Sequence, residues 1–326
     1  MPLVTVLMPA WNRERFVREA VDSVLAQTFA DFELLVIDDG STDATAAIVA
    51  AVVDPRVRCL REPHRGIGAA MNAGLRAARG RYVARLDSDD VWLPELLATQ
   101  VAILEARPEA GVAYARAQGM EADGALTAHV WGMAPRWPDD HLRSMLWGDF
   151  TCNITTVARR ELLERIGGFD ETLIAGEDWD LWLRIAKHAR FAFTDRVLAR
   201  FRWHADNLTG PGSTLRDRPL VERFRVLDKF FATPDLPPGL LALRAVAYRN
   251  VYVGTGLLRL GRRDHAAALR DFGRALACGT NPITTLGRIG WFVLDWNYLS
   301  RRAWGRRLID WQSAVRRRWR ERPARA

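Results

Sequence analysis

The first 90 residues alternate short runs of aliphatic and β-branched residues with longer segments whose apolar positions recur at helical spacing. The short runs predict strands, and the longer segments predict helices. Because strands that alternate with helices are typical of βαβ units, we expect an α/β fold with a mostly parallel sheet that helices cover on both faces. The expected strands are Val4–Met8, Glu33–Ile37, Arg56–Leu60 and Tyr82–Leu86, and the expected helices cover 14–27, 43–53 and 68–78.

The pattern is less regular between residues 90 and 210. Residues 116–150 combine Gly, Pro and Trp without a clear period, and we expect loops there. The other expected elements are helices over 94–106, Ala158–Ile166 and Glu177–Lys187, and strands at Val112–Ala115, Phe191–Thr194 and Val197–Arg202.

Turn-forming residues concentrate at 205–219, and we place a domain boundary at residue 210. The pattern after this boundary is helical. Residues 246–282 resemble one tetratricopeptide-type hairpin, but a stacked array needs about three such units, so a plain helical module explains the segment better. We therefore expect an α/β domain over 1–210, a helical module over 211–280 and a basic helical tail over 281–326.

Charge is distributed unevenly along the 326 residues. The formal net charge of +8 at pH 7 by itself favours a nucleic-acid or membrane partner. However, residues 281–326 hold eleven arginines against Asp295, Asp310 and Glu321, so this segment carries the whole excess, and we expect no nucleic-acid partner. The segment also holds five tryptophans. Arg with Trp is typical of helices on anionic membranes, and a solvated helix that packs its tryptophans on the protein is the alternative.

Cysteine usage and the N-terminal segment bear on location. Cys59, Cys152 and Cys278 are far apart and form no CxxC pair, which indicates free thiols in a reducing compartment. The segment MPLVTVLMPAWN lacks the basic region and cleavage site of a signal peptide, and no run of about 18 apolar residues is present. We expect a cytoplasmic protein, with peripheral contact to the cytoplasmic face of a membrane through 281–326 as a further option.

Two clusters of carboxylates follow predicted strands. Asp38 and Asp39 end the second strand; a polar rim for a nucleoside and an ordinary capped turn into a helix both explain them. The segment RLDSDD (85–90) follows the fourth strand. Its three acids repel one another unless a cation compensates, and Mg²⁺ typically takes one or two carboxylates plus substrate phosphates. The second cluster therefore predicts a metal–diphosphate site at the sheet edge where ligands bind.

Three further features carry weaker signals. Gly66 and Gly68 open a helix as in a dinucleotide-binding fingerprint, but Met71 stands where a third glycine is needed, so we do not expect an oxidoreductase. Asp178 begins a helical stripe that is otherwise apolar. It is either a general base or an ordinary acid in the first turn of a helix, where it interacts with the helix dipole. His204 is a candidate metal ligand, although a lone histidine is more often structural.

Taken in order, six segments resemble the inverting glycosyltransferases of family 2, which have the GT-A fold. The resemblance covers about the first 205 residues and leaves the helical C-terminal part outside. The matching segments are VTVLMPAWN (4–12), VIDDGSTD (36–43), GIGAAMNAG (66–74), RLDSDD (85–90), GGFDE (167–171) and EDWDLWLR (177–184).

The resemblance implies a role for each motif. Asp89 would hold Mg²⁺ or Mn²⁺ on the donor diphosphate, with Asp90 as the alternative, and His204 would complete the metal site. Asp178 matches the base that deprotonates the acceptor hydroxyl. The residues implied in nucleotide-sugar binding are Pro9, Ala10, Asn12, Asp39, Asn72, Asp87 and Ser88.

The implied activity is a metal-dependent, inverting transfer of a sugar from a nucleotide-diphosphate donor to a hydroxyl on a glycan or lipid-linked acceptor. A uridine diphosphate sugar is the donor expected first, and the product would belong to cell-surface polysaccharide or glycoconjugate synthesis. Two other classes stay open. A nucleotidyltransferase needs a Gly-rich, basic loop after the first strand, where this chain has Pro9–Asn12, and a catalytically silent sugar-nucleotide-binding protein would lack the activity.

Overall fold

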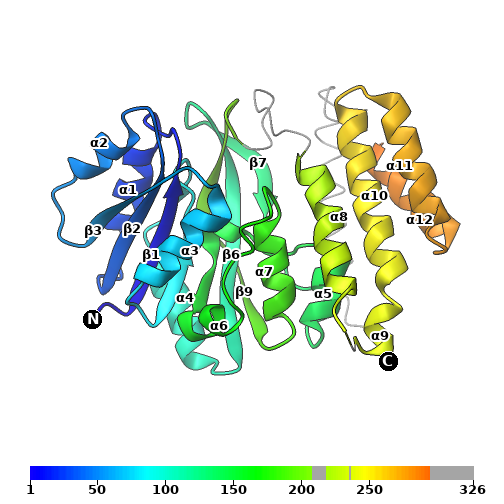
Figure 1. Cartoon of the computed structure of the whole chain (residues 1–326), viewed down its shortest axis with the longest axis horizontal. Helices are drawn as coiled ribbons and strands as arrows, with labels where there is room; N and C mark the ends of the chain where they lie inside the picture. The colour runs from blue at the N-terminus through cyan, green and yellow to red at the C-terminus, as the bar shows by residue number, and fades with distance from the viewer. Residues whose placement is uncertain (208–217, 235, 294–326) are drawn as a thin grey trace. The chain divides into compact units, whose positions relative to one another are not determined.

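Figure 1 shows the computed structural model of the chain, which describes residues 1–207, 218–234 and 236–293. The chain divides into two units, Met1–Thr233 and Pro234–Ala326. The first unit holds the sheet and every candidate site residue, and the second is helical where it is described. The two units are described separately below.

The first unit is built on a nine-stranded mixed sheet in the order β3-β2-β1-β4-β8-β6-β9-β5, with β7 paired to β6. The four strands at the start of the chain pair in parallel, as expected. Beyond β4 the sheet changes character, because β8 is antiparallel to both β4 and β6, whereas β6 and β9 are parallel. The sheet is therefore mixed, with its longest ladders parallel, as expected. The strands are β1 (Val4–Ala10), β2 (Phe32–Asp39), β3 (Val57–Glu62), β4 (Tyr82–Arg85), β5 (Val91–Trp92), β6 (Ala110–Glu121), β7 (Leu126–Trp131), β8 (Val157–Arg159) and β9 (Arg190–Trp203).

Helices pack on both faces of this sheet, which confirms the expected α/β class (Figure 1). On one face, Val4, Val6 and Met8 of β1 share a core with buried residues of α1 and α4. On the other face, α3 packs closely, since a Cβ at Gly74 would lie 2.9 Å from the Leu7 side chain. The helices of this unit are α1 (Val17–Leu25), α2 (Thr45–Ala50), α3 (Ile67–Ala77), α4 (Leu96–Ala106), α5 (His141–Trp147), α6 (Arg160–Arg165), α7 (Glu177–Ile185) and α8 (Arg218–Phe231), with a 3-10 turn at Asn153–Thr155.

The middle of the chain differs most from expectation. Instead of loops, residues 116–150 contain most of a hairpin formed by β6 and β7, followed by α5. β6 lies inside the sheet and is buried on both faces along most of its length, so its sequence shows no polar alternation. The helix expected over Ala158–Ile166 begins at Arg160, because the preceding three residues pair as β8.

β9 is one long strand where two short strands were expected. Its pairing with β6 shifts register between Phe193 and Val197, opposite Tyr114 and Arg116. The polar segment between the two expected strands is therefore a bulge within one strand, and not a turn.

The first unit also includes α8, so the division after Thr233 lies later than the boundary placed at residue 210. Lys229 of α8 is ion-paired with Asp180 of α7, at 2.8 Å, and with Asp170, at 2.6 Å. Although burial opposes it, hydrogen bonding from Lys229 and Thr172 lowers the pKa of Asp170 to about 2. These contacts tie α8 to the α/β unit despite the turn-rich sequence before it.

The second unit contains α9 (Pro238–Leu241), α10 (Arg244–Gly261), α11 (His265–Ala277) and α12 (Pro282–Val293). α10 and α11 form the helical hairpin that the sequence indicated, and Asp264 caps α11 by accepting from the Ala267 amide. In the part of the chain that is described, no helix combines the length and apolar character that crossing a membrane requires. Most of the Arg- and Trp-rich tail, residues 294–326, lies outside the described residues.

Candidate active site

Parallel pairing brings the predicted polar residues to one edge of the sheet. In the ladder, Ala10 of β1 lies opposite Asp38 of β2, and Leu7 lies opposite Arg85 of β4. The carboxyl ends of these three strands therefore open at the same edge, which is where open α/β sheets bind ligands. Pro9 and Ala10 are buried there as the end of β1.

Asn12 joins the loops that follow β1 and β2. Its φ of 51° lies in the left-handed region, which asparagine tolerates better than most residues. The Asn12 amide donates to Ser41 Oγ at 3.0 Å, and the Thr42 amide donates to Asn12 Oδ1 at 2.8 Å. Asn12 is thus brought to the site as predicted, where it fixes the loop geometry.

Asp39 holds the loop that leads into α3. Its carboxylate accepts from the Arg65 and Gly66 amides, both at 2.9 Å, and contacts His64 Nδ1 at 2.8 Å. These partners leave about one acceptor position of the carboxylate for a ligand. Trp11 stacks on the His64 ring at 4.5 Å and still exposes 45% of its surface, so an aromatic face is available beside Asp39.

Asn72 clamps the segment that contains GGFDE. Its side chain donates to the Phe169 carbonyl and to Glu171 Oε1, each at 2.9 Å, and accepts from the Phe169 amide at 2.8 Å. Gly168, with a φ of +67°, lies so close that a Cβ there would be 2.4 Å from Asn72 Oδ1. The amide of Asn72 is therefore already committed to partners within the protein.

Arg85 connects the acidic cluster to α7. This buried guanidinium donates to Asp87 Oδ1 at 2.9 Å and to Glu177 Oε1 at 3.2 Å. Burial opposes its charge, but Asp87 and Glu177 outweigh burial and raise the pKa of Arg85. Burial and then the charge of Asp178 raise the pKa of Glu177 to about 7, although Arg85 opposes this shift. Ser88, between the acids, is buried.

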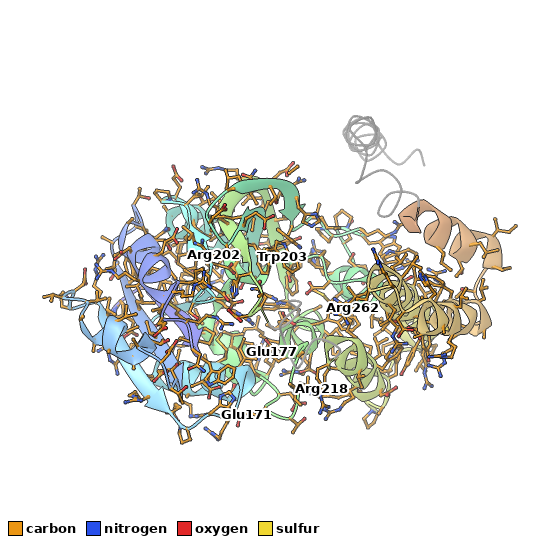
Figure 2. All side chains as sticks on the ribbon, turned by 90° about the horizontal axis from the view of Figure 1, so that it is seen from above. Glu171, Glu177, Arg202, Trp203, Arg218 and Arg262 are labelled. Atoms are coloured by element: carbon orange, nitrogen blue, oxygen red, sulfur yellow. The ribbon has the colours of Figure 1, made fainter. Side chains whose placement is uncertain are left out.

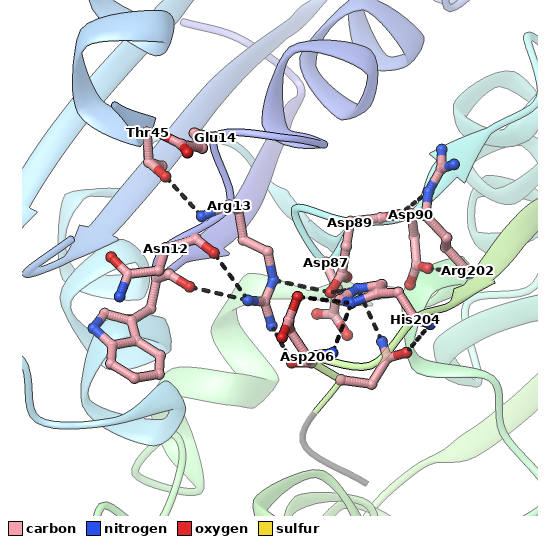
Figure 3. A network of polar contacts seen from close by, with 12 residues as sticks. Asn12, Arg13, Glu14, Thr45, Asp87, Asp89, Asp90, Arg202, His204 and Asp206 are labelled. Atoms are coloured by element: carbon pink, nitrogen blue, oxygen red, sulfur yellow. Dashed lines mark hydrogen bonds and ion pairs between the residues drawn. The ribbon is translucent and has the colours of Figure 1, made fainter. Parts of the chain in front are cut away.

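Asp89 lies between two cationic or hydrogen-bonding partners (Figure 3). Its Oδ2 atom lies 3.0 Å from Arg13 Nε and 3.0 Å from His204 Nε2. Burial alone would raise the pKa of Asp89, but the hydrogen bond from His204 and the charge of Arg13 outweigh burial and lower it. The structure thus brings Asp89 and His204 together across 115 positions of sequence.

His204 contacts Asp89 through Nε2 and accepts from the Asp206 amide through Nδ1, at 3.2 Å. A neutral imidazole that accepts at Nδ1 carries its proton on Nε2. In this arrangement His204 donates to Asp89 and orients that carboxylate. Its ring packs on Phe16 at a centroid distance of 4.6 Å, which fixes the plane of the imidazole.

Asp90 is the most deeply buried acid of the cluster. Its Oδ1 accepts from the Arg202 amide at 2.7 Å, whereas its buried Oδ2 has no hydrogen-bond partner among the described residues. Burial, followed by the charges of Asp89 and Asp87, raises the pKa of Asp90 well above its ordinary value. Such a carboxylate is stabilised either by a proton or by a nearby cation.

The donor atoms of this cluster fit a hard divalent cation. Asp87, Asp89 and Asp90 carry carboxylate oxygens, and one of these oxygens, Asp90 Oδ2, has no hydrogen-bond partner within the part of the chain that the structure describes. Among the described residues, no group of three or more His, Cys, Asp or Glu side chains is arranged to hold an ion by itself. An open set of this kind suits Mg²⁺ or Mn²⁺, which complete their coordination with substrate phosphate and water.

Asp178 lies at the start of α7 and belongs to a separate group of side chains. Its Oδ1 accepts from the Trp179 amide at 2.6 Å, and its Oδ2 accepts from Asn153 Nδ2. Trp182 Nε1 donates to Asn153 Oδ1 at 2.7 Å, so a buried indole orients the amide that orients Asp178. Asp178 as a whole residue is half-buried. Glu177, the residue before it, is labelled in Figure 2.

Asp149 is a second acid near Asp178. Although Asp149 is an exposed residue, its carboxyl group has crowded surroundings, and burial there together with the charge of Asp178 raises its pKa to about 6. Thr151 donates to Asp149 Oδ1 through its amide, at 2.9 Å, and through its hydroxyl, at 2.7 Å.

Comparison with known proteins decides the family. The family described as glycosyl transferase family 2 matches residues 5–167. The UDP-Glc:alpha-D-GlcNAc-diphosphoundecaprenol beta-1,3-glucosyltransferase WfaP of Escherichia coli is 30% identical over 231 residues, which cover 70% of this chain and 86% of that protein. This chain belongs to glycosyl transferase family 2. The resemblance found in its motifs is therefore confirmed.

Solved structures place the fold of this family 2 glycosyltransferase in the GT-A class. S. aureus TarS 1–349 in complex with UDP-GlcNAc superposes with a TM-score of 0.62 and 18% identity over 90% of this chain and 84% of that chain. The mannosyltransferase PcManGT of Pyrobaculum calidifontis, in complex with GDP-Man and Mn²⁺, gives 0.60 and 22% over 98% and 88%. Several curated relatives are much longer: the chain spans 30% of the chondroitin synthase of Escherichia coli, at 29% identity over 211 residues.

The structure adds residues to this glycosyltransferase site that the sequence did not single out. Arg13 directly follows the motif VTVLMPAWN, but nothing in the sequence indicated its contact with Asp89. Arg85 stands inside RLDSDD, and Trp11 inside VTVLMPAWN. In contrast, Asn153 and Asp149 come from the irregular middle segment, where no periodicity or motif marked them.

Proposed function

We propose that this family 2 glycosyltransferase moves a sugar from a nucleotide-diphosphate donor to an acceptor hydroxyl, with a divalent cation and with inversion at the anomeric carbon. One observation carries the proposal. The acids around Asp89 suit a cation, and the carboxylate of Asp178 suits a base. These two groups are separate, and Arg85 and Glu177 link them. Inversion by one direct displacement needs this separation, because the base and the leaving group lie on opposite sides of the reacting carbon.

The donor nucleotide would lie on the ends of β1 and β2. The exposed indole of Trp11 offers a stacking surface for a base, and Asp39 keeps about one acceptor position for a base N–H. Asn12, Asn72 and Ser88 would shape this pocket mainly through the loops that they hold. A uridine diphosphate sugar is the first donor to test; the nucleotide sugars bound by TarS and PcManGT support the donor class.

Asp89, with Asp90 as the alternative, would hold Mg²⁺ or Mn²⁺ on the donor diphosphate, and His204, whose Nε2 lies 3.0 Å from Asp89 Oδ2, would complete the metal site. A divalent cation at this position stabilises the negative charge that develops on a departing diphosphate. The Mn²⁺ in the PcManGT complex supports this assignment.

Asp178 would accept the proton of the acceptor hydroxyl. The acceptor oxygen forms its bond to the anomeric carbon while the bond from that carbon to the diphosphate oxygen breaks. Asn153 donates a hydrogen bond to Asp178 Oδ2 and so holds the carboxylate in one orientation. A base held in this way receives a proton more readily than one that rotates freely. A donor with an α-linked sugar then gives a β-linked product.

The acceptor would be a glycan or lipid-linked sugar in polysaccharide or glycoconjugate synthesis. The name of the relative WfaP, which specifies a diphosphoundecaprenol-linked sugar, supports a lipid-linked acceptor. Contact of residues 281–326 with an anionic membrane stays a prediction that fits such an acceptor. Liposome co-sedimentation of the full chain and of a chain ending at residue 280 checks it, with weaker binding expected for the shorter chain.

A donor panel tests the proposed function. The purified chain is incubated with UDP- and GDP-linked sugars, and release of nucleoside diphosphate is measured with Mn²⁺, with EDTA, and after Mn²⁺ is restored. We expect release from at least one donor, loss of release in EDTA and recovery with Mn²⁺. Release that EDTA does not diminish would overturn the metal-dependent mechanism.

A further inference from the structure

The guanidinium of Arg13 is held in an oxygen-lined position where three loops meet (Figure 3). Its Nε donates to Asp89 Oδ2 at 3.0 Å, and its Nη1 donates to the Trp11 and Asn12 carbonyls at 3.2 and 3.1 Å. Its Nη2 donates to the Asp206 carbonyl at 3.2 Å. Four hydrogen bonds therefore use most of the five donors of this side chain.

The backbone fixes where this side chain begins. The Arg13 amide donates to Thr45 Oγ1 at 2.7 Å, and the left-handed turn at Asn12 precedes it. Only 18% of the Arg13 side chain is exposed, so its charge is directed at the acidic cluster and away from solvent. Because a guanidinium keeps its charge across the working pH range, this neutralisation does not depend on protonation.

A divalent cation that bound Asp89 through Oδ2 would need the oxygen that Arg13 occupies. Asp89 Oδ2 already takes both Arg13 and His204. A cation bound to that oxygen would lie within contact distance of the guanidinium, and like charges at such a distance repel strongly in a buried place. Arg13 therefore has to leave Asp89 when a cation binds there.

We propose that Arg13 is a built-in counter-cation that occupies Asp89 when no divalent cation is bound and pairs with the donor diphosphate once the cation displaces it. The proposal rests on the proposed metal-dependent function and assigns Arg13 a part in it. A diphosphate accepts a guanidinium through charge-assisted hydrogen bonds, so it offers the displaced side chain a new partner. The cation alone then binds weakly, and the cation and the nucleotide bind cooperatively.

Binding of Mn²⁺ to the full-length chain, measured by electron paramagnetic resonance with and without UDP or GDP, tests this proposal. Arg13→Met removes the charge and keeps the length of the stem, and Arg13→Gln serves if that variant does not fold. Arg13→Lys keeps the charge. Arg18→Met is the matched control, because Arg18 is exposed on α1 and paired with Asp22 instead of the cluster.

We expect Arg13→Met to bind Mn²⁺ alone roughly tenfold more tightly than the unmodified chain, since one charged hydrogen bond no longer competes. The factor by which the nucleotide tightens Mn²⁺ binding should fall by a similar amount. Arg13→Lys and Arg18→Met should stay close to the unmodified chain. These effects concern binding, so a change in turnover alone does not produce them.

Three results would overturn parts of the account in distinguishable ways. Equal or weaker Mn²⁺ binding by Arg13→Met and Arg13→Gln, with binding by the unmodified chain intact, would show that Arg13 is a structural contact and would leave the proposed function standing. Tighter Mn²⁺ binding with undiminished cooperativity would remove the diphosphate half of the proposal. Failure of every variant to bind Mn²⁺, even with nucleotide, would overturn the proposed function and this inference together.

Discussion

The donor half of the site, at the ends of β1, β2 and β4, and the acceptor half, around Asp178, are built in different ways. In the donor half, Asp39, Asn72 and Asp89 each have two or more partners within the protein. In the acceptor half, Asp178 likewise accepts from two groups, the Trp179 amide and Asn153 Nδ2, but it is only half-buried, whereas Asp39 and Asp89 are buried. The two halves therefore differ in burial: the donor-half acids Asp39 and Asp89 lie within a preassembled frame, whereas the acid of the acceptor half belongs to a half-buried residue.

The difference implies that the two halves fail separately. Replacing the base should stop the chemistry and leave the nucleotide bound. Replacing a donor-half acid should prevent binding. Replacing a residue that only holds the frame should cost stability and little else. The predictions below follow this order of expected effect.

Asp178→Asn should lower the rate of sugar transfer by about 10³-fold, because an amide cannot accept the proton of the hydroxyl. The affinity for UDP or GDP with Mn²⁺ should be unchanged, since Asp178 lies outside the donor half. Nucleoside diphosphate release and calorimetry measure the two quantities. Transfer at the original rate would remove the base assignment.

Asp89→Ala should weaken Mn²⁺-dependent nucleotide binding by about a hundredfold, because the lost carboxylate is the one that Arg13 and His204 orient. Asp22→Ala is the matched control, as Asp22 is an exposed acid on α1. Calorimetric affinities in Mn²⁺ provide the comparison. An affinity equal to that of the control would refute the assignment of the cation to Asp89.

Asn72→Ala should lower the free energy of unfolding by about 2 kcal/mol, since it leaves the Phe169 amide and carbonyl without their partner. Urea unfolding measures this change. Nucleotide affinity, measured on the same variant, separates a frame residue from a direct contact. Unchanged stability with a large loss of affinity would place Asn72 in contact with the donor after all.

Glu177→Gln should flatten the dependence of stability on pH. The pKa of Glu177 is raised to about 7 in the folded chain, so the folded state keeps a proton that the unfolded state releases at lower pH. This group therefore makes the chain less stable as pH rises from about 5 to about 7. The variant should lose roughly 2 to 3 kcal/mol of the difference between pH 5 and pH 8 in urea unfolding. An unaltered difference would contradict the raised pKa.

The same comparison explains how much the sequence could predict. β1 to β4 were predicted because each is a short apolar run followed by a turn, and the acids after them had only one edge of the sheet to occupy. Asp39, Asp89 and His204 accordingly lie where the motifs indicated. What no pattern indicated was their internal partners, because a hydrogen bond such as Arg13 to Asp89 joins residues 76 positions apart.

The acceptor half was less predictable for a physical reason. β6 is buried on both faces and carries small residues, so it shows no alternation, and the three-residue β8 exists only through its neighbours. Asn153, which orients Asp178, stands in a 3-10 turn between such elements. Tertiary pairing decides these segments, and local propensity does not.

Anomalous diffraction from crystals grown with Mn²⁺ and UDP or GDP tests the central claim most directly. The account predicts a Mn²⁺ peak within bonding distance of the Asp89 carboxylate and next to the nucleotide diphosphate, with Asp178 free of both. Bound nucleotide with its Mn²⁺ peak away from Asp89, or a diphosphate in contact with Asp178, would contradict the division of this site into a donor half and an acceptor half.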